Sequence, residues 1–107
     1  MIKVICIGKL KENYLKEGIN DYLTRISTYH KINLIELADK IEKTFIGYAN
    51  ISFIIGGSDG LHDEIKNKCH YKLSFSHLTF PHGLFRLILL EQIYRSFKII
   101  NHETYHK

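Results

Sequence analysis

The sequence predicts an α/β domain with a largely parallel β-sheet. Short apolar runs rich in β-branched residues, typical of buried strands, alternate with segments whose apolar residues recur at helical spacing. One such run ends in a glycine-rich turn at Gly56, and a long apolar helix follows the only proline, Pro81. Strands that alternate with helices are typical of βαβ units, in which neighbouring strands run parallel.

Length and composition set the limits of this prediction. The 107 residues fit one domain, spanning residues 1–107, with a modest core, and 45% hydrophobic against 24% charged residues excludes a disordered chain. The sequence contains no run near the roughly 18 apolar residues of a membrane span and no secretory leader pattern. We therefore expect a cytoplasmic protein with no membrane partner. A net charge of +4 permits an RNA partner without requiring one.

The first half of the chain predicts two strands and two helices. Residues 1–8 are almost wholly apolar and end in glycine, which predicts a strand at the centre of the sheet. Residues 11–27 have apolar side chains at helical spacing, and residues 31–37 alternate as a second strand. Residues 38–47 predict a brief helix, because Ile41 and Phe45 are spaced i, i+4 and Gly47 suits a C-cap.

The second half predicts two more strands and two more helices. Residues 50–55 predict a third strand, residues 61–68 a helical turn or two, and residues 71–75 a fourth strand. Pro81 has the fixed φ and missing N–H that suit a first helical turn, and the long helix continues to about Ile100.

The long helix has a narrow polar strip and one charged residue on its apolar side. At about 100° per residue, Glu91, Arg95 and Lys98 share the strip, whereas Arg86 projects from the opposite side near Leu90. Apolar residues cover nearly all the remaining circumference, which predicts burial against the chain's own sheet and against a second body. Because a monomer rarely exposes so large an apolar patch, we expect a dimer.

Two loops are expected to form one cleft at the edge of the sheet. The glycine-rich turn at residues 56–60 and the loop at residues 75–80 both leave strand ends, and ligands of parallel sheets bind outside those ends. Glycine lets backbone amides approach a ligand closely. The turn lacks the spacing of dinucleotide and nucleoside triphosphate motifs, and a simple tight turn remains its alternative interpretation.

Other chemistries find little support in the sequence. Several histidines gather in the last third of the chain, but their spacing matches no common metal motif, so we expect no metal. Ser58, Ser74 and Ser76 lack the Gly-x-Ser-x-Gly elbow, and turn or capping roles suit them better. Cys6 and Cys69 fit no disulfide scaffold and are expected to be free thiols.

The C-terminal tail, residues 101–107, directly follows the most apolar helix and contains two histidines, a tyrosine and a lysine. Chain ends usually fray, so a solvated tail without function is one interpretation. The other is a short arm that caps a cleft, with an aromatic ring to stack on a base, an imidazole to move a proton and a cation for phosphate.

Five segments of the second half stand out together. They are Ile55-Gly-Gly-Ser-Asp-Gly, Leu73-Ser-Phe-Ser-His-Leu-Thr-Phe-Pro-His, Arg86, Glu91-Gln-Ile-Tyr-Arg and Tyr105-His-Lys. In order and spacing they closely resemble the RlmH-type family of SPOUT methyltransferases. The opening Val4-Ile-Cys-Ile-Gly-Lys-Leu-Lys and the following helix with Tyr22 also resemble the start of this family.

The resemblance implies a fold and an activity. The fold would be a SPOUT-like α/β-knot domain with a trefoil-knotted cofactor site. The chain would act as a homodimer in which the C-terminal helices pack together. The enzyme would use S-adenosylmethionine to methylate N3 of a pseudouridine in 23S ribosomal RNA of the large subunit. Its partner would be ribosomal RNA or the assembled ribosome, and not DNA.

The resemblance also implies the residues of the site. Those that would bind the cofactor are Gly56, Phe75, Ser76, His77, Leu78, Thr79 and Phe80. His106 would accept the imino proton of the base, Arg86 would neutralise negative charge, and Tyr105 would stack on or hydrogen-bond the base. The alternative for Arg86 is a pairing with Glu91 or with a carbonyl in the dimer interface.

The chain departs from the family pattern between Glu36 and Phe45, where roughly fifty residues are absent. The missing part comprises a helix, a strand and the beginning of the next helix. In the family it contributes to the cofactor pocket and to the loop around which the chain is knotted. An alternative function is therefore a catalytically silent SPOUT-like scaffold that dimerises. A third alternative is an unrelated small metal-binding α/β protein.

Overall fold

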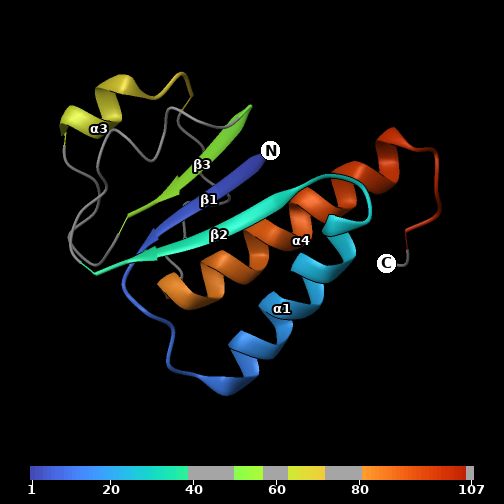
Figure 1. Cartoon of the computed structure of the whole chain (residues 1–107), viewed down its shortest axis with the longest axis horizontal. Coiled ribbons are helices and arrows are strands. Elements are labelled where there is room, and N and C mark those ends of the chain that lie inside the picture. Colours follow the sequence, from blue (N-terminus) through green and yellow to red (C-terminus); the bar gives the residue numbers. More distant parts are fainter. Residues whose placement is uncertain (39–49, 57–62, 72–80, 106–107) are drawn as a thin grey trace.

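The computed structural model describes residues 1–38, 50–56, 63–71 and 81–105. The elements follow in the order β1 (Ile2–Ile7), α1 (Asn13–Ser27), β2 (Ile32–Leu37), β3 (Ile51–Ile55), α3 (Asp63–Lys68) and α4 (His82–Ile100). The three strands form a parallel sheet in the order β2-β1-β3, which confirms the α/β class and the central first strand (Figure 1). The helix predicted over residues 38–47 and nearly all of the strand predicted over residues 71–75 lie outside the described residues.

The strands are paired so that they end together. Ile2 is opposite both Ile32 and Ile51, and the pairing continues to the last residues of each strand. The first five residues of β1 are buried because neighbouring layers cover both of its faces. We call the edge where the strands end, at Ile7, Leu37 and Ile55, the carboxyl edge.

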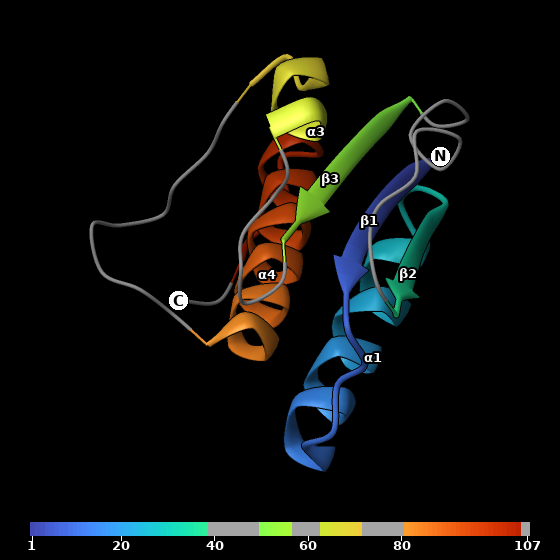
Figure 2. The same ribbon diagram turned by 90° about the vertical axis from the view of Figure 1, so that its left-hand side faces the viewer.

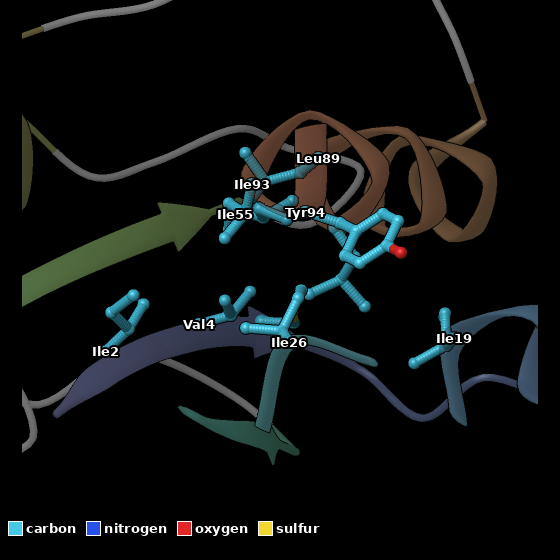
Figure 3. Packing of buried hydrophobic residues seen from close by; sticks show 10 residues of the cluster. Ile2, Val4, Ile19, Ile26, Ile55, Leu89, Ile93 and Tyr94 are labelled. Atoms are coloured by element: carbon cyan, nitrogen blue, oxygen red, sulfur yellow. The ribbon is translucent and has the colours of Figure 1, made fainter. Parts of the chain in front are cut away.

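The helices form layers on both sides of the sheet. The main core lies between the sheet and the pair α1 and α4, and Figure 3 shows Val4 and Ile26 across from Leu89 and Ile93. A smaller cluster, in which Ile5 meets Ile65 of α3, covers the opposite face. Leu90 is completely buried in the main core, so this face of α4 packs within the chain and not against a second body.

Two glycines allow α1 and α4 to approach closely. A Cβ at Gly18 would lie 3.0 Å from Leu87, and a Cβ at Gly83 would lie 2.5 Å from Leu10. The contact at Gly83 places the start of α4 beside the segment that follows β1. Figures 1 and 2 show that α4 runs against the strands, so its first turn lies toward the carboxyl edge and its last turn lies where the strands begin.

Candidate active site

Arg86 of α4 connects three segments at the carboxyl edge. It is only 3% exposed, and its Nη1 donates a hydrogen bond to Glu36 Oε2 at 2.7 Å. Its Nη2 donates to the carbonyl oxygens of Ile7 at 2.8 Å and Gly8 at 2.9 Å. The same Glu36 oxygen accepts the backbone N–H of Leu10 at 2.9 Å. The guanidinium therefore fixes α4 to the ends of β1 and β2.

A glycine shapes the chain at this point. Gly8 has a φ of 89°, a conformation that favours glycine because it lacks a Cβ. Its N–H donates to the carbonyl of Leu37 at 2.6 Å, so it pairs with β2 while its own carbonyl faces Arg86. The turn after β1 thus presents two successive carbonyls to one guanidinium.

Arg86 has two interpretations, a group that neutralises charge in the site and a structural pairing, and its contacts favour the second in part. The charge of Arg86 is already paired within the chain, with Glu36 and not with Glu91. Within the described ranges its buried Nε has no hydrogen-bond partner, so one donor is left for another group. The sequence motifs do not identify Glu36 as a site residue, although a single acidic residue near the end of the apolar strand Ile32–Leu37 is a usable signal.

Cys6 lies in the core beside this pair. Burial raises the pKa of its thiol to about 11, while Arg86 lowers the pKa and Glu36 raises it. The thiol is therefore protonated near neutral pH, and a protonated buried thiol is a poor nucleophile. Cys6 and Cys69 are both free.

The tail turns back on α4 immediately after the helix ends. The N–H of Glu103 donates to the carbonyl of Lys98 at 2.9 Å, and the N–H of His102 donates to the carbonyl of Ile99 at 3.1 Å. This pair of bonds is a Schellman motif, with His102 at a φ of 56° where glycine is usual. Lys98 also forms an ion pair with Glu103 at 3.4 Å. We call residues 101–105 the C-terminal hook.

The hook ends with Tyr105 packed against the polar strip of α4. The Tyr105 hydroxyl donates to Glu91 Oε2 at 2.8 Å, and that oxygen also accepts from Arg95 Nε at 3.1 Å and Nη2 at 2.9 Å. The Tyr105 ring lies edge-on to Tyr94, with 5.4 Å between ring centroids, and the Arg95 guanidinium lies 5.2 Å from its centroid. Burial, followed by hydrogen bonding to Glu91, raises the pKa of Tyr105. The tail is thus packed as far as Tyr105.

The residues predicted for the site fall in two places. Gly56 directly follows β3 and is half-buried at the carboxyl edge, where Arg86 also lies. Tyr105 contacts α4 at Glu91, and about 14 Å of helix separates Glu91 from the first turn of α4 at His82. The predicted loop at residues 75–80 and His106 lie outside the described residues.

Two general features of the described ranges bear on function. No three His, Cys, Asp or Glu side chains in them gather into a group that could hold a metal ion. None of the helices they contain is long and apolar enough to cross a membrane.

A parallel sheet that gathers polar groups where its strands end is typical of ligand-binding α/β proteins. Comparison with known proteins identifies the family. A family model described as "Predicted SPOUT methyltransferase" matches residues 1–45 and 35–106. The chain therefore belongs to the SPOUT methyltransferase family, as the motifs predicted.

The similarity to individual relatives extends over nearly the whole chain. The chain is 38% identical to the ribosomal RNA large subunit methyltransferase H of Acetivibrio thermocellus, over 99% of both chains. It is equally similar to the protein of that name from Streptococcus uberis. It is 40% identical to the putative ribosomal RNA large subunit methyltransferase H of Methanococcus maripaludis, again over 99% of both chains.

The comparisons also locate the departure from the family pattern. The alignments extend over 157 positions, about fifty more than the 107 residues of this chain. The family model matches in two parts that overlap between residues 35 and 45. The prediction of an internal shortening of roughly fifty residues in this region is thus confirmed.

Proposed function

We propose that the protein is an S-adenosylmethionine-dependent enzyme that methylates N3 of a pseudouridine in large-subunit ribosomal RNA, in the cytoplasm. The observation that supports this most strongly is the near full-length similarity to enzymes named ribosomal RNA large subunit methyltransferase H. The family match over both parts of the chain supports the methyltransferase class. The net charge of +4 is compatible with an RNA substrate.

The carboxyl edge suits the cofactor. Gly56 leaves backbone groups accessible after β3, and the loop at residues 75–80 would complete the pocket. Because Glu36 neutralises Arg86, the edge presents mainly backbone groups, and the buried Nε of Arg86 is the remaining donor. When bound, S-adenosylmethionine supplies an electrophilic methyl group. We assign Arg86 to holding the edge in shape more than to contacting the base.

The reaction requires a proton acceptor. N3 of the base forms a bond to the methyl carbon as the carbon–sulfur bond breaks, and the N3 proton must be taken up by a base. A histidine that is neutral near pH 7 is suited to this, and we propose His106. A general base must lie within hydrogen-bond reach of the proton that it accepts.

This distance requirement favours a site made by two chains. The hook contacts α4 about 14 Å of helix away from the carboxyl edge of its own chain. If two α4 helices pack antiparallel, the last turn of one lies beside the first turn of the other. The exposed side chains of Ile99 and Ile100 provide apolar surface for such a contact. We therefore propose a homodimer in which the tail of one chain serves the carboxyl edge of its partner.

The experiment that tests this function has two measurements on the intact chain. Calorimetric titration with S-adenosylmethionine should detect binding, and unmodified ribosomes should gain one labelled methyl group on a pseudouridine. Gly56→Val is the matched variant: it should abolish binding while the apo protein melts at nearly the same temperature. If the intact chain shows neither binding nor methyl transfer, the proposal is contradicted.

A second candidate function is a dimeric SPOUT scaffold without catalysis. The specific observation in its favour is the absence of roughly fifty internal residues relative to the relatives. In the family these residues contribute to the cofactor pocket. A dimer that gives no heat with S-adenosylmethionine would support this candidate over the enzyme.

A further inference from the structure

The C-terminal hook is fixed by three separate sets of contacts. The Schellman motif sets its direction at His102, the ion pair of Lys98 with Glu103 holds its middle, and the hydrogen bond of Tyr105 to Glu91 holds its end. A φ of 56° is uncommon for a residue other than glycine. A frayed chain end would make none of these contacts.

Glu91 is the centre of the last set. Its Oε2 accepts one hydrogen bond from Tyr105 and two from Arg95, and its side chain is 19% exposed. The carboxylate is therefore oriented by Arg95 within the same helix, one turn away. The hydroxyl of Tyr105 has a single proton, and that proton is donated to Glu91. The ring is in contact with Tyr94 and with the Arg95 guanidinium.

We propose that Glu91 and Arg95 are positioning residues for methyl transfer: they clamp Tyr105 and thereby fix the backbone from which the next residue, His106, extends. This inference rests on the proposed function, because His106 is the proton acceptor proposed there. Tyr105 then serves as the tether of the tail, and not as the group that contacts the base. A catalytic base held in one place loses less freedom on reaching the transition state than one on a free chain end.

The opposite role would be a resting state in which the clamp withholds the tail until it is released. The two roles predict opposite changes in the reaction rate when the clamp is loosened. A clamp that positions His106 makes the reaction slower when it is loosened, whereas a clamp that withholds His106 makes the reaction faster. We favour positioning because Tyr105 is held at Glu91, about 14 Å of helix from the first turn of α4, and the proposed antiparallel dimer brings this part of α4 toward the carboxyl edge of the partner.

The test compares Tyr105→Phe, Glu91→Gln and the double variant in the full chain. Each single change should lower kcat about ten- to a hundredfold with little change in KM for ribosomes. The double variant should be no slower than the slower single variant, since both act on the same contact: Tyr105→Phe removes its donor and Glu91→Gln removes the charge that strengthens it. Tyr14→Phe and Glu17→Gln are matched controls on the exposed side of α1 and should leave kcat unchanged.

A second readout does not depend on activity. Amide hydrogen exchange of His102 and Glu103, whose N–H groups donate to carbonyls of α4, should accelerate in Tyr105→Phe and Glu91→Gln but not in the two controls. If exchange in Tyr105→Phe, which removes the donor of the bond to Glu91, equals that of the wild type, the clamp does not exist and the inference is wrong.

The kinetic outcomes separate the remaining possibilities. Loss of activity in Tyr105→Phe alone, or losses that multiply in the double variant, would mean that the hydroxyl acts directly on the substrate. A faster reaction in both single variants would mean that the clamp withholds the tail. Either result overturns the inference. If the wild type transfers no methyl group, the proposed function fails, and hydrogen exchange alone decides whether the clamp exists.

Discussion

At the scale of single residues, the ion pair of Arg86 is expected to be structural. Arg86→Met would leave the carbonyls of Ile7 and Gly8 without their donor and Glu36 without its partner. Because the guanidinium is buried while the Glu36 side chain is 30% exposed, this change should lower the free energy of unfolding by about 3 kcal/mol, mainly through the two carbonyls left without a donor. Urea denaturation followed by circular dichroism would measure it.

The control for this prediction is Arg25→Met. Arg25 pairs with Asp21 on the surface of α1, where the two side chains are 51% and 55% exposed. Such pairs contribute about 0.5 kcal/mol or less. If the loss at Arg86 were equally small, the guanidinium would not hold the carboxyl edge, and a role toward the substrate would gain support.

The raised pKa of Tyr105 predicts a loss of stability at alkaline pH. Its pKa is raised first by burial and then by the hydrogen bond to Glu91, so the folded chain holds the phenolic proton more tightly than the unfolded chain. The resulting stability is fully present below the usual tyrosine pKa of about 10 and is lost as pH rises toward the folded value. Above about pH 10, we expect the wild type to lose stability more steeply than Tyr105→Phe.

Urea denaturation at several alkaline pH values would measure this slope. Tyr14→Phe, at a tyrosine that is 72% exposed, should follow the wild type. Arg95 stays positively charged over this range and keeps facing the ring, so the difference belongs to the phenol and its neighbours. Parallel curves for wild type and Tyr105→Phe would contradict the raised pKa.

At the scale of the elements, the end of α4 is strained at one residue. His102 occupies the left-handed position of the Schellman motif, which costs other residues roughly 1 kcal/mol relative to glycine. His102→Gly should therefore raise the free energy of unfolding by about 0.5 to 1 kcal/mol. His102→Ala keeps the unfavourable φ and should bring no gain. Equal stabilities of the glycine and alanine variants in thermal unfolding would show that the motif is not formed.

The elements themselves were largely predictable. Each described strand and helix lies within two residues of its predicted bounds, because apolar periodicity and turn residues are local signals. Pro81 occupies the N-cap position, one residue before the helix starts. The contacts of Arg86 and Tyr105 were not predictable, because they join residues that are distant in sequence. The turn at His102 gave no signal, because glycine is the usual residue there.

Helical periodicity also could not say which apolar face of α4 meets a partner. Leu90, on the apolar side of the helix, is completely buried in the chain's own core, whereas Ile99 and Ile100 are exposed. The motifs correctly predicted the family and the likeness to methyltransferases, because their order and spacing are specific. The residues predicted to bind the cofactor, Gly56 excepted, lie outside the described part and stay predictions.

At the scale of the whole molecule, the proposed dimer can be tested without disturbing the core. Ile99 is 66% exposed in the single chain, so Ile99→Glu should cost the fold little. In the dimer the substitution would bury a carboxylate, which costs several kcal/mol, so the dimer should dissociate. Light scattering should then give the mass of one 12.6 kDa chain, against twice that mass for the wild type. Tyr71→Glu, at a tyrosine that is 86% exposed, is the control and should remain a dimer.

The last prediction concerns the internal shortening. The resemblance to the family implies that the residues absent near Glu36 contribute to the cofactor pocket, so we expect this chain to bind S-adenosylmethionine more weakly than its relative from Acetivibrio thermocellus. Each lost contact worth about 1.4 kcal/mol would weaken binding tenfold. Calorimetric titration of the two proteins side by side would measure the difference. Gly56→Val should abolish the binding that remains in this chain. Equal affinities would show that the carboxyl edge and the loop at residues 75–80 are sufficient for the cofactor.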